Sequence, residues 1–376
     1  MLNNTPAVFA FEDAKRYQAM KNRLFLLNTS LNFLFLLVLV LTGLSRQIKE
    51  WLLFLSEDLL RISALYFSVF AVSAFLLSFP MEYYEGFVLE HRYGLSRQAL
   101  GAWLKDVLKR SIIIFVVSLI MVEAVYFFLA NFQDTWWLWA SLFWFFVSVV
   151  FTRIFPKVIL PLFFKPTPLG PGVLHDRIYA LLSKLKIAVK DIYVLDFSKK
   201  TVKANAMVAG LGAGRRIYLS DTLVQGFPAD EVEAVLAHEL GHYVRRDTFK
   251  LVVAGLAGAF FSFYLSALAL RRLIHFFGFS SISDIAGLPL LLAVFLLAGL
   301  ILLPVQNGFS RFIEKQADIF ALKTTGDNAA FISMIQRLGE RNFSDFSPPK
   351  AVEFFLYDHP PISKRIKLAK NMQLKV

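Results

Sequence analysis

The chain contains six apolar runs of about the 20 residues that a helix needs to cross a lipid bilayer. They lie near Leu24–Leu44, Ile62–Phe79, Ile112–Ala130, Trp137–Phe155, Leu251–Leu270 and Leu288–Val305. The composition agrees, because 57% of the 376 residues are hydrophobic and only 18% are charged. A large soluble core could explain one or two such runs, but not six. The sequence therefore predicts an all-α polytopic membrane region.

The distribution of basic residues predicts the orientation of these spans. Lys and Arg precede the first span, separate the second from the third, and are frequent in residues 157–250 and after the sixth span. The connection Asn131–Trp136 has none, although Arg271 and Arg272 follow the fifth span. By the positive-inside rule, both termini and the long polar segment face the cytoplasm. Membrane lipid then accounts for the net charge of +12, and we expect no nucleic-acid partner because no binding module accompanies the charge.

The spans divide the chain into four parts. We expect four transmembrane helices in residues 1–156, a cytoplasmic catalytic insertion in 157–250, two further transmembrane helices in 251–306 and a cytoplasmic part in 307–376. The insertion begins with a stretch rich in Pro and Gly, residues 165–172, which cannot continue a helix. A short helix is expected around Asp176–Lys186. Strand patterns follow at Asp191–Phe197, Ala204–Gly210 and Arg216–Ser220, with a glycine-rich hairpin turn at residues 211–215. The insertion is thus predicted to be an α+β domain.

The insertion carries the sequence His238-Glu-Leu-Gly-His242, an H-E-x-x-H motif. On a helix, two imidazoles four positions apart project from one face and can bind one metal ion. Glu239 would lie beside the open position of the metal, where a carboxylate can take a proton from water. The preceding residues 229–237 are rich in helix formers, which favours the required helix.

A hydrolytic zinc site normally has three protein ligands, so the two histidines need a partner. Glu314, just after the sixth span, is the best candidate. Asp318 lies one helical turn later on the same face, where a carboxylate can orient a ligating imidazole. A pair of acids at this spacing is weak evidence alone. The pair gains weight because the segment with the two histidines and the segment with Glu314 both adjoin membrane spans on the predicted cytoplasmic side.

These motifs together resemble the type I CAAX prenyl proteases, which are integral-membrane zinc endopeptidases. The resemblance rests on five segments that extend over nearly the whole chain. They are His238–His242, the run Asn307–Asp318 of the form N-x-x-S-R-x-x-E-x-x-A-D, His359–Ile366, Phe155–Leu162 and Ala204–Ala206. The first motif alone would indicate only a metalloprotease.

The resemblance implies a role for each matching residue. His238, His242 and Glu314 would bind one Zn²⁺ per chain, with Glu239 as general base and then proton donor, and Asp318 would support a ligand. His359 and Arg365 would lie near the site as oxyanion donors. Asn205, Ala206, Met207 and Val208 would form an open strand edge on which a peptide substrate pairs.

The resemblance also implies a fold, a substrate class and a location. Family members enclose a water-filled chamber within their membrane helices and cleave the C-terminal tripeptide from prenylated CAAX proteins. Eukaryotic members are found in the endoplasmic reticulum and have seven spans, one more than this chain. The modest length and the missing first span suggest a prokaryotic enzyme of the inner membrane, whose physiological substrate need not be prenylated. We expect it to be a monomer.

Three other functions are consistent with parts of the pattern. A site-2 type protease would place the H-E-x-x-H motif within a span, but charged residues flank the motif here. A quality-control zinc protease that acts on misfolded membrane proteins shares the first motif but typically has four spans. A transporter would explain the spans and the ionisable Glu123 within the third of them, because such groups usually face a cavity or a partner.

Overall fold

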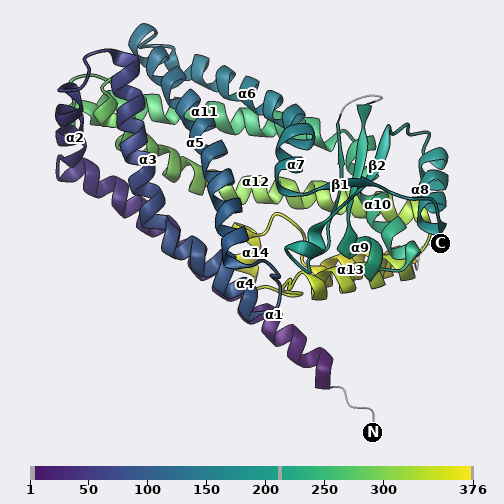
Figure 1. The fold of residues 1–376 in the computed structure, drawn as a ribbon. Helices are drawn as coiled ribbons and strands as arrows, with labels where there is room; N and C mark the ends of the chain where they lie inside the picture. Colours follow the sequence, from purple (N-terminus) through teal and green to yellow (C-terminus); the bar gives the residue numbers. More distant parts are fainter. Residues whose placement is uncertain (1–4, 211–213, 374–376) are drawn as a thin grey trace.

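The computed structural model describes residues 5–210 and 214–373 (Figure 1). Within them, six helices are long and apolar enough to span a membrane. They are α1 (Thr5–Leu41), α3 (Leu59–Tyr83), α5 (Leu100–Asn131), α6 (Trp136–Ile154), α11 (Asp247–Phe276) and α12 (Leu288–Thr325). Each overlaps one of the six predicted runs, so the polytopic helical architecture is confirmed.

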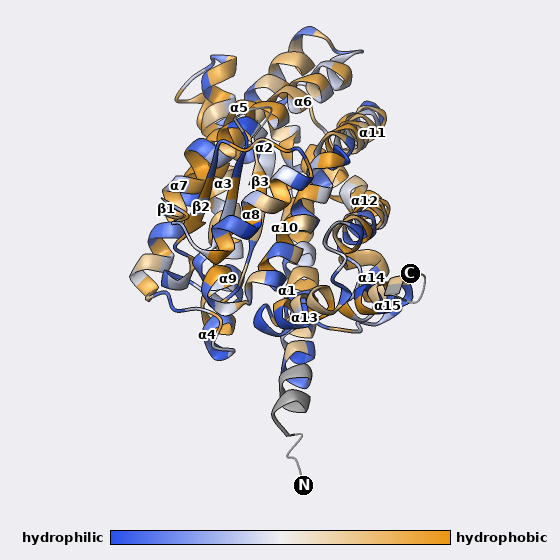
Figure 2. Cartoon of the chain, turned by 90° about the vertical axis from the view of Figure 1, so that its right-hand side faces the viewer, coloured by the Kyte–Doolittle hydropathy of each residue, from blue (hydrophilic) through white to orange (hydrophobic). Residues whose placement is uncertain are grey.

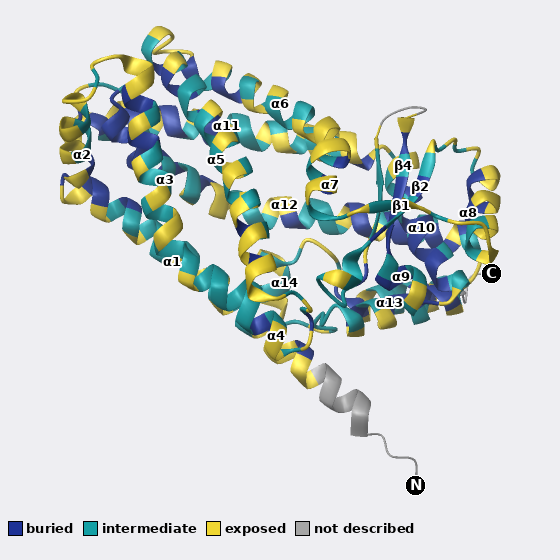
Figure 3. Cartoon of the chain, viewed as in Figure 1, coloured by how far each residue is buried: buried dark blue, intermediate teal, exposed yellow. Residues whose placement is uncertain are grey.

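The outer faces of these helices are apolar and exposed, as in a membrane protein. In the most apolar stretch of each helix, between 11% and 39% of the residues are buried. The remaining apolar side chains point outward, which Figure 2 shows as hydrophobic colour on the outer faces of the helices and Figure 3 as exposed positions on the same helices. Water would strongly disfavour so large an apolar surface, whereas lipid does not.

Shorter elements connect the spans. The helix α2 (Leu44–Leu53) follows α1, and α3 continues through a π-helical segment η1 (Tyr84–Leu89) into α4 (Glu90–Arg92). A second π-helical segment η2 (Phe155–Ile159) and α7 (Leu160–Phe163) follow α6, while the 3₁₀ turn η5 (Ile285–Gly287) precedes α12. Among the described residues, α12 is the longest helix, with 38 residues, and it continues without a break past residue 306. A membrane span and the segment predicted to carry the third metal ligand are therefore parts of one continuous helix.

The charged residue inside the third span has a partner. Glu123 on α5 accepts a hydrogen bond from the hydroxyl of Ser63 on α3, with oxygen-to-oxygen distances of 2.8 Å. The contact links two membrane helices by a polar pair, as expected for an ionisable group at this depth.

The α/β part forms a four-stranded sheet beside the helical region (Figure 1). The strand order is β1 (Pro166–Pro168), β2 (Asp191–Leu195), β4 (Arg216–Ser220) and β3 (Ala206–Ala209). β2 and β4 are parallel, and the other two pairs are antiparallel. The three predicted strands are present, and antiparallel β3 and β4 form the predicted hairpin, although residues 211–213 of its turn lie outside the described residues. The sequence did not reveal β1, because its prolines argue against a strand except at the edge of a sheet, where it lies.

Further helices complete the α/β part, and all of those named next except α14 contribute residues to its apolar core. They are α8 (Val173–Lys184), α9 (Asp221–Gly226), α10 (Ala229–Val244), α13 (Asn328–Arg341), α14 (Lys350–Leu356) and α15 (Ile362–Gln373), with a 3₁₀ turn η3 (Phe197–Lys199). α8 corresponds to the helix predicted around residues 176–186. The largest buried apolar cluster joins residues of α8, β4, α10, α12 and α13. The end of the sixth span is therefore part of the core of the catalytic domain.

The catalytic domain is also attached to the first membrane helices. The ammonium group of Lys203 lies 2.8 Å from Glu90 of α4 and donates to the hydroxyl of Tyr17 on α1 at 3.1 Å. The backbone N–H of Val202 donates to the carbonyl of Leu95 at 3.0 Å. These contacts fix the segment that leads into β3.

The buried carboxylate of Asp284, just before η5 and beside α2, makes the folding stability depend on pH. Asp284 is 7% exposed, and its carboxylate lies 2.8 Å from the ammonium group of Lys49 on α2. Burial alone would raise the pKa of Asp284, but Lys49 and Ser280 lower it below the usual 3.8. The unfolded chain thus binds this proton more tightly, so the stabilisation is complete above about pH 4 and is lost as the pH falls through the folded-state pKa.

We expect Asp284→Asn to lower the free energy of unfolding by about 1–3 kcal/mol at pH 7. The loss should shrink toward pH 3 in detergent melting curves.

Candidate active site

The helix α10 presents the two histidines of the motif on one face. It begins after Pro228, and Asp230 and Glu231 in its first turn favour a helix N-terminus. The Nε2 atoms of His238 and His242 lie 3.2 Å apart, as the four-residue spacing predicts. Glu239 follows His238 on the same helix.

The helix α12 brings Glu314 to these nitrogens. One oxygen of its carboxylate lies 3.2 Å from Nε2 of His238 and the other 3.4 Å from Nε2 of His242. The Glu314 side chain is only 10% exposed. Among the described residues, His238, His242 and Glu314 form a group whose potential ligand atoms all lie within 4.8 Å of one another. The structure thus brings together the three residues that the sequence suggests as ligands.

The second ring nitrogen of each histidine faces a carboxylate. Nδ1 of His238 lies 2.9 Å from Asp318, which was predicted to support a ligand, and Nδ1 of His242 lies 3.2 Å from Asp247. Both aspartates are fully buried. Sequence reasoning missed the role of Asp247 because Arg246 adopts a left-handed backbone conformation (φ 56°) between α10 and α11. That kink turns Asp247 back toward His242. The only signal in the sequence is that the two residues are five positions apart.

The residues present fit a metal ion. If the proton of each imidazole is on Nδ1, the nitrogen that faces an aspartate, both Nε2 atoms carry lone pairs, and these converge on the Glu314 carboxylate. One of its oxygens, Oε2, is buried and has no hydrogen-bond partner among the described residues. Lone pairs so close together repel one another unless a cation lies between them. Two imidazoles and one carboxylate are also the ligand set of a hydrolytic zinc site with one open position.

The electrostatics of the site favour positive charge at the same place. Burial would lower the pKa of His238, but its contacts with Asp318 and Glu314 prevail and raise it to about 9. Burial would raise the pKa of Glu314, yet the two histidines that face its carboxylate hold it well below its usual value. The pKa of Glu239 is raised by burial, which makes its carboxylate a better proton acceptor.

His359 lies beside the ligands, in the loop between α14 and α15. Its Nε2 is 3.4 Å from Glu314, and its Nδ1 is 2.8 Å from Asp358. Burial would lower the pKa of His359, but Asp358 and the negative charge of Glu314 raise it above its usual value. A histidine that keeps its proton can donate a hydrogen bond to a developing oxyanion. The position agrees with the role suggested by the sequence, which stays a prediction.

Arg365 on α15 binds Asp318. Its Nε and Nη2 donate to the two carboxylate oxygens at 2.8 and 2.5 Å. This fork-shaped pair holds Asp318 against His238, so Arg365 acts on the metal site through Asp318 in this structure. Its predicted contact with an oxyanion is not tested by this geometry.

Two side chains of α12 hold the His359 loop in place. Asn307 donates to the carbonyl of Phe355 at 2.7 Å. Arg311 donates to the carbonyls of Glu353 and Tyr357 at 2.8 and 2.5 Å. Both residues belong to the run N-x-x-S-R-x-x-E-x-x-A-D quoted above, and here they satisfy carbonyls at the end of α14. The same helix therefore supplies a metal ligand and the support for His359.

The strand predicted to bind substrate lies at an edge of the sheet. Asn205 precedes β3, which includes Ala206, Met207 and Val208 and pairs only with β4 among the described strands. β3 also contacts α10, the helix that carries the histidines. An extended peptide could pair with the free edge of β3 as a fifth strand.

Removal of Asp318 should be strongly destabilising. Asp318→Leu would leave the guanidinium of Arg365, which is 14% exposed, without a partner. We expect a loss of about 3–5 kcal/mol in the free energy of unfolding and roughly 10- to 100-fold weaker metal binding. The double variant Asp318→Leu/Arg365→Met should recover part of the stability, because no buried charge remains unpaired, but not the metal affinity. Equal melting temperatures for the single and double variants would argue against this coupling.

Comparison with known proteins agrees with the geometry. Residues 6–165 match the family model for the CAAX prenyl protease N-terminal region with five membrane helices, and residues 169–373 match the model for peptidase family M48. The chain belongs to peptidase family M48. It is 32% identical over 300 residues to the CAAX prenyl protease 1 homolog of Arabidopsis thaliana, a match that covers 77% of this chain and 68% of the relative.

Two further matches extend over most of the molecule. A metalloprotease of Bacillus subtilis described as uncharacterized, YhfN, is 29% identical over 366 residues, with 95% of this chain and 85% of the relative covered. The crystal structure of Ste24p from S. mikatae superposes with a TM-score of 0.86 at 23% identity, over 96% of this chain and 89% of that structure. This last likeness shows that the fold is shared.

Membership of family M48 establishes the general activity. The chain is a multi-pass membrane metalloendopeptidase, and His238, His242 and Glu314 on α10 and α12 form a group that could hold its metal ion. The transporter and site-2 protease alternatives are therefore set aside, and the quality-control alternative is not favoured.

Proposed function

We propose that this metalloendopeptidase holds one zinc ion between His238, His242 and Glu314 and cleaves peptides that pair with β3 near the cytoplasmic face of the membrane. The convergence of two imidazoles and one carboxylate at the junction of α10 and α12 carries the proposal. The basic residues around the spans support the cytoplasmic orientation.

The chain's own residues supply the proton transfers. A bound zinc ion would contribute Lewis acidity toward a water molecule and the scissile carbonyl. Glu239 would accept the proton of the attacking water and later deliver it to the leaving amine. His359, held by Asp358, would donate a hydrogen bond to the oxyanion that develops on the carbonyl. Asp318 and Asp247 would keep the two ligating imidazoles in the correct tautomer.

Recognition would rest first on the peptide backbone. Pairing with β3 requires an extended, accessible segment and does not depend on the side chains. Relatives from plants, fungi and animals are named CAAX prenyl protease 1 or its homolog. We therefore propose that prenylated peptides with a C-terminal CAAX sequence are one class of substrate and that the enzyme acts as a monomer.

The test compares matched peptides with purified enzyme in detergent. A prenylated CAAX peptide and its unprenylated counterpart are incubated with enzyme, with and without a chelator, and the products are identified by mass spectrometry. We expect metal-dependent cleavage of both, with a higher kcat/KM for the prenylated peptide. Chelator-resistant cleavage would refute the metal assignment. Equal kcat/KM for the two peptides would refute the preference for prenylated substrates alone.

A further inference from the structure

The short helix α14 presents an apolar face to the outside of the molecule. Ala351, Phe354 and Phe355 are exposed, and their spacing of three and four residues places them on one side of the helix. The two phenylalanines are 52% and 50% exposed. Glu353, on the other side of the helix, pairs with Lys364 of α15 at 2.6 Å. A helix surrounded by water has the opposite arrangement, with its polar side outward.

The helix α14 lies at the depth where the sixth span leaves the hydrocarbon core of the membrane. It packs beside the middle of α12 (Figure 1), and Asn307 of α12 donates to the carbonyl of Phe355 at 2.7 Å. The helix α12 begins at Leu288, and from there to Asn307 it rises about 30 Å. The hydrocarbon core of a bilayer is also about 30 Å thick. The contact between α12 and α14 is therefore at the cytoplasmic boundary of the membrane.

The apolar face of α14 adjoins the lipid-facing surface of the spans. The six spans contact one another in a ring, in the order α1, α3, α5, α6, α11 and α12, which returns to α1. Figure 2 shows α14 next to α12, near the outer edge of the molecule. Ile301, Val305 and Phe312 form an exposed apolar stripe on α12, and α14 touches α12 at Asn307, between these positions in the sequence. A surface already in contact with lipid thus continues onto α14.

The charges around this face fit the boundary of a membrane. Lys350 at the start of α14 is exposed, and so is Lys315, about one turn after Phe312 on α12. Apolar side chains beside lysines match the acyl chains and the anionic head groups of a cytoplasmic leaflet. The partner that this surface fits is therefore the lipid bilayer itself.

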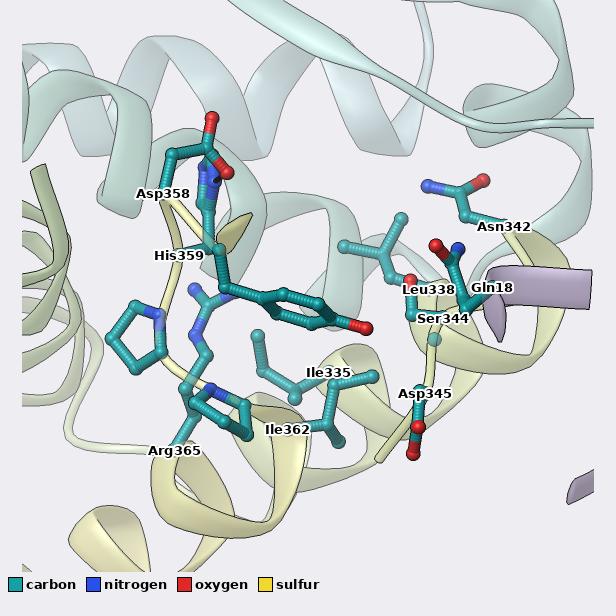
Figure 4. Close-up of a pocket in the computed structure, with 14 residues that line it drawn as sticks. Gln18, Ile335, Leu338, Asn342, Ser344, Asp345, Asp358, His359, Ile362 and Arg365 are labelled. Atoms are coloured by element: carbon teal, nitrogen blue, oxygen red, sulfur yellow. Dashed lines mark hydrogen bonds and ion pairs between the residues drawn. The ribbon is translucent and has the colours of Figure 1, made fainter. Parts of the chain in front are cut away.

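The same helix determines the position of His359. The loop that carries His359 leaves the end of α14 and leads directly into α15, as Figure 4 shows. Arg311 holds the beginning of this loop by donating to the carbonyl of Tyr357 at 2.5 Å. Nε2 of His359 lies 3.4 Å from the Glu314 carboxylate. A shift of α14 relative to the membrane would therefore move His359 relative to the metal ligands.

We propose that α14 is an interfacial anchor whose Phe354 and Phe355 insert into the cytoplasmic leaflet, and that this contact with lipid positions His359 for catalysis. The two phenylalanines are positioning residues, because they act on the reaction through His359. The catalytic part of the inference rests on the proposed function, in which His359 stabilises the oxyanion. The insertion itself does not depend on that role.

A spin label measures the insertion directly. The chain has no cysteine, so one introduced cysteine is its only labelling site. Phe355→Cys is labelled with a nitroxide in nanodiscs of phosphatidylethanolamine and phosphatidylglycerol, and Ala351→Cys repeats the measurement with both phenylalanines in place. We expect oxygen to reach both labels and a water-soluble nickel complex to be excluded. The exposed Tyr179 of α8 gives the control, because a label at Tyr179→Cys should be several-fold more accessible to nickel.

Two results of this measurement would overturn the insertion. Labels at both positions that react with nickel as readily as the α8 label would place α14 in water. Labels shielded from oxygen and nickel alike would indicate that a protein surface, and not lipid, covers this face.

Cleavage of an unprenylated fluorogenic peptide in the same nanodiscs tests the effect on catalysis. We expect Phe354→Ser/Phe355→Ser to lower kcat by about tenfold, because a small displacement of a catalytic group is costly. KM and zinc content should stay unchanged. Phe354→Leu/Phe355→Leu keeps an apolar face and should restore most of kcat. Phe54→Ser, at an exposed phenylalanine that follows α2, makes the same change far from His359 and should leave kcat unaltered.

A double-mutant cycle assigns the effect to His359. On the residual activity of His359→Ala, the two serine substitutions should cause no further loss. An equal tenfold loss in that background, or an unchanged kcat in the serine variant alone, would overturn the link between α14 and His359. If the wild-type enzyme shows no chelator-sensitive cleavage, the proposed function fails, and the spin labels still decide whether α14 is inserted.

Discussion

Glu239→Gln is expected to bind the metal as the parent enzyme does and to lose about 10³-fold in kcat. The amide has nearly the shape of the carboxylate but cannot accept a proton from water. His238, His242 and Glu314 are unchanged in this variant, so the ligand set stays complete. Metal analysis and cleavage of a fluorogenic peptide would measure both properties on one sample.

The control for this variant is another glutamate on the same helix. Glu233 of α10 forms an ion pair with Arg177 at 2.9 Å, away from the metal ligands. Glu233→Gln should therefore retain cleavage within a factor of about two or three, because a surface ion pair contributes little. Turnover by Glu239→Gln at the wild-type rate would rule out Glu239 as the general base.

The spans and the histidine pair could be predicted because their signals are local. A run of apolar residues long enough to cross a membrane needs no partner to be recognised. Likewise, two histidines four residues apart share a helix face whatever the rest of the chain does. The structure adds that the span ending near Val305 continues within the same helix, α12, so one unbroken helix positions Glu314.

The supporting contacts depend on tertiary geometry and were less visible in sequence. Asp318 was predicted because it lies one turn from Glu314 on the same helix. Asp247 was missed because its approach to His242 requires the left-handed conformation of Arg246. Arg365 was placed near the site, but its pairing with Asp318 joins α15 to α12 and leaves no periodic pattern.

A cavity of about 330 Å³ beside His359 shows the same limit more strongly. Gln18 and Asp345 lie at opposite ends of the chain, and each is an ordinary polar residue in its local sequence. They become parts of one wall only because α1 extends beyond the membrane and packs against the segment after α13. A cavity wall that arises from such long-range assembly can be recognised only in the folded chain.

Glu314→Ala is expected to remove the metal and abolish cleavage. Two imidazoles would remain, and a two-ligand site binds zinc far more weakly than a three-ligand site. We expect metal affinity to fall by more than about 100-fold, beyond the effect of losing a residue that only supports a ligand. Zinc content after dialysis, measured with the peptidase rate, tests this expectation.

Two further variants distinguish loss of a ligand from loss of a buried charge. Glu314→Gln keeps the volume of the side chain but offers a neutral amide, so it should resemble Glu314→Ala in zinc content. Glu314→Asp keeps the charge but shortens the reach toward nitrogens that now lie 3.2 and 3.4 Å away, so partial zinc binding is expected. Full zinc content in Glu314→Ala would mean that another group completes the site. His359 would then be the first residue to test, because its Nε2 already lies 3.4 Å from the Glu314 carboxylate.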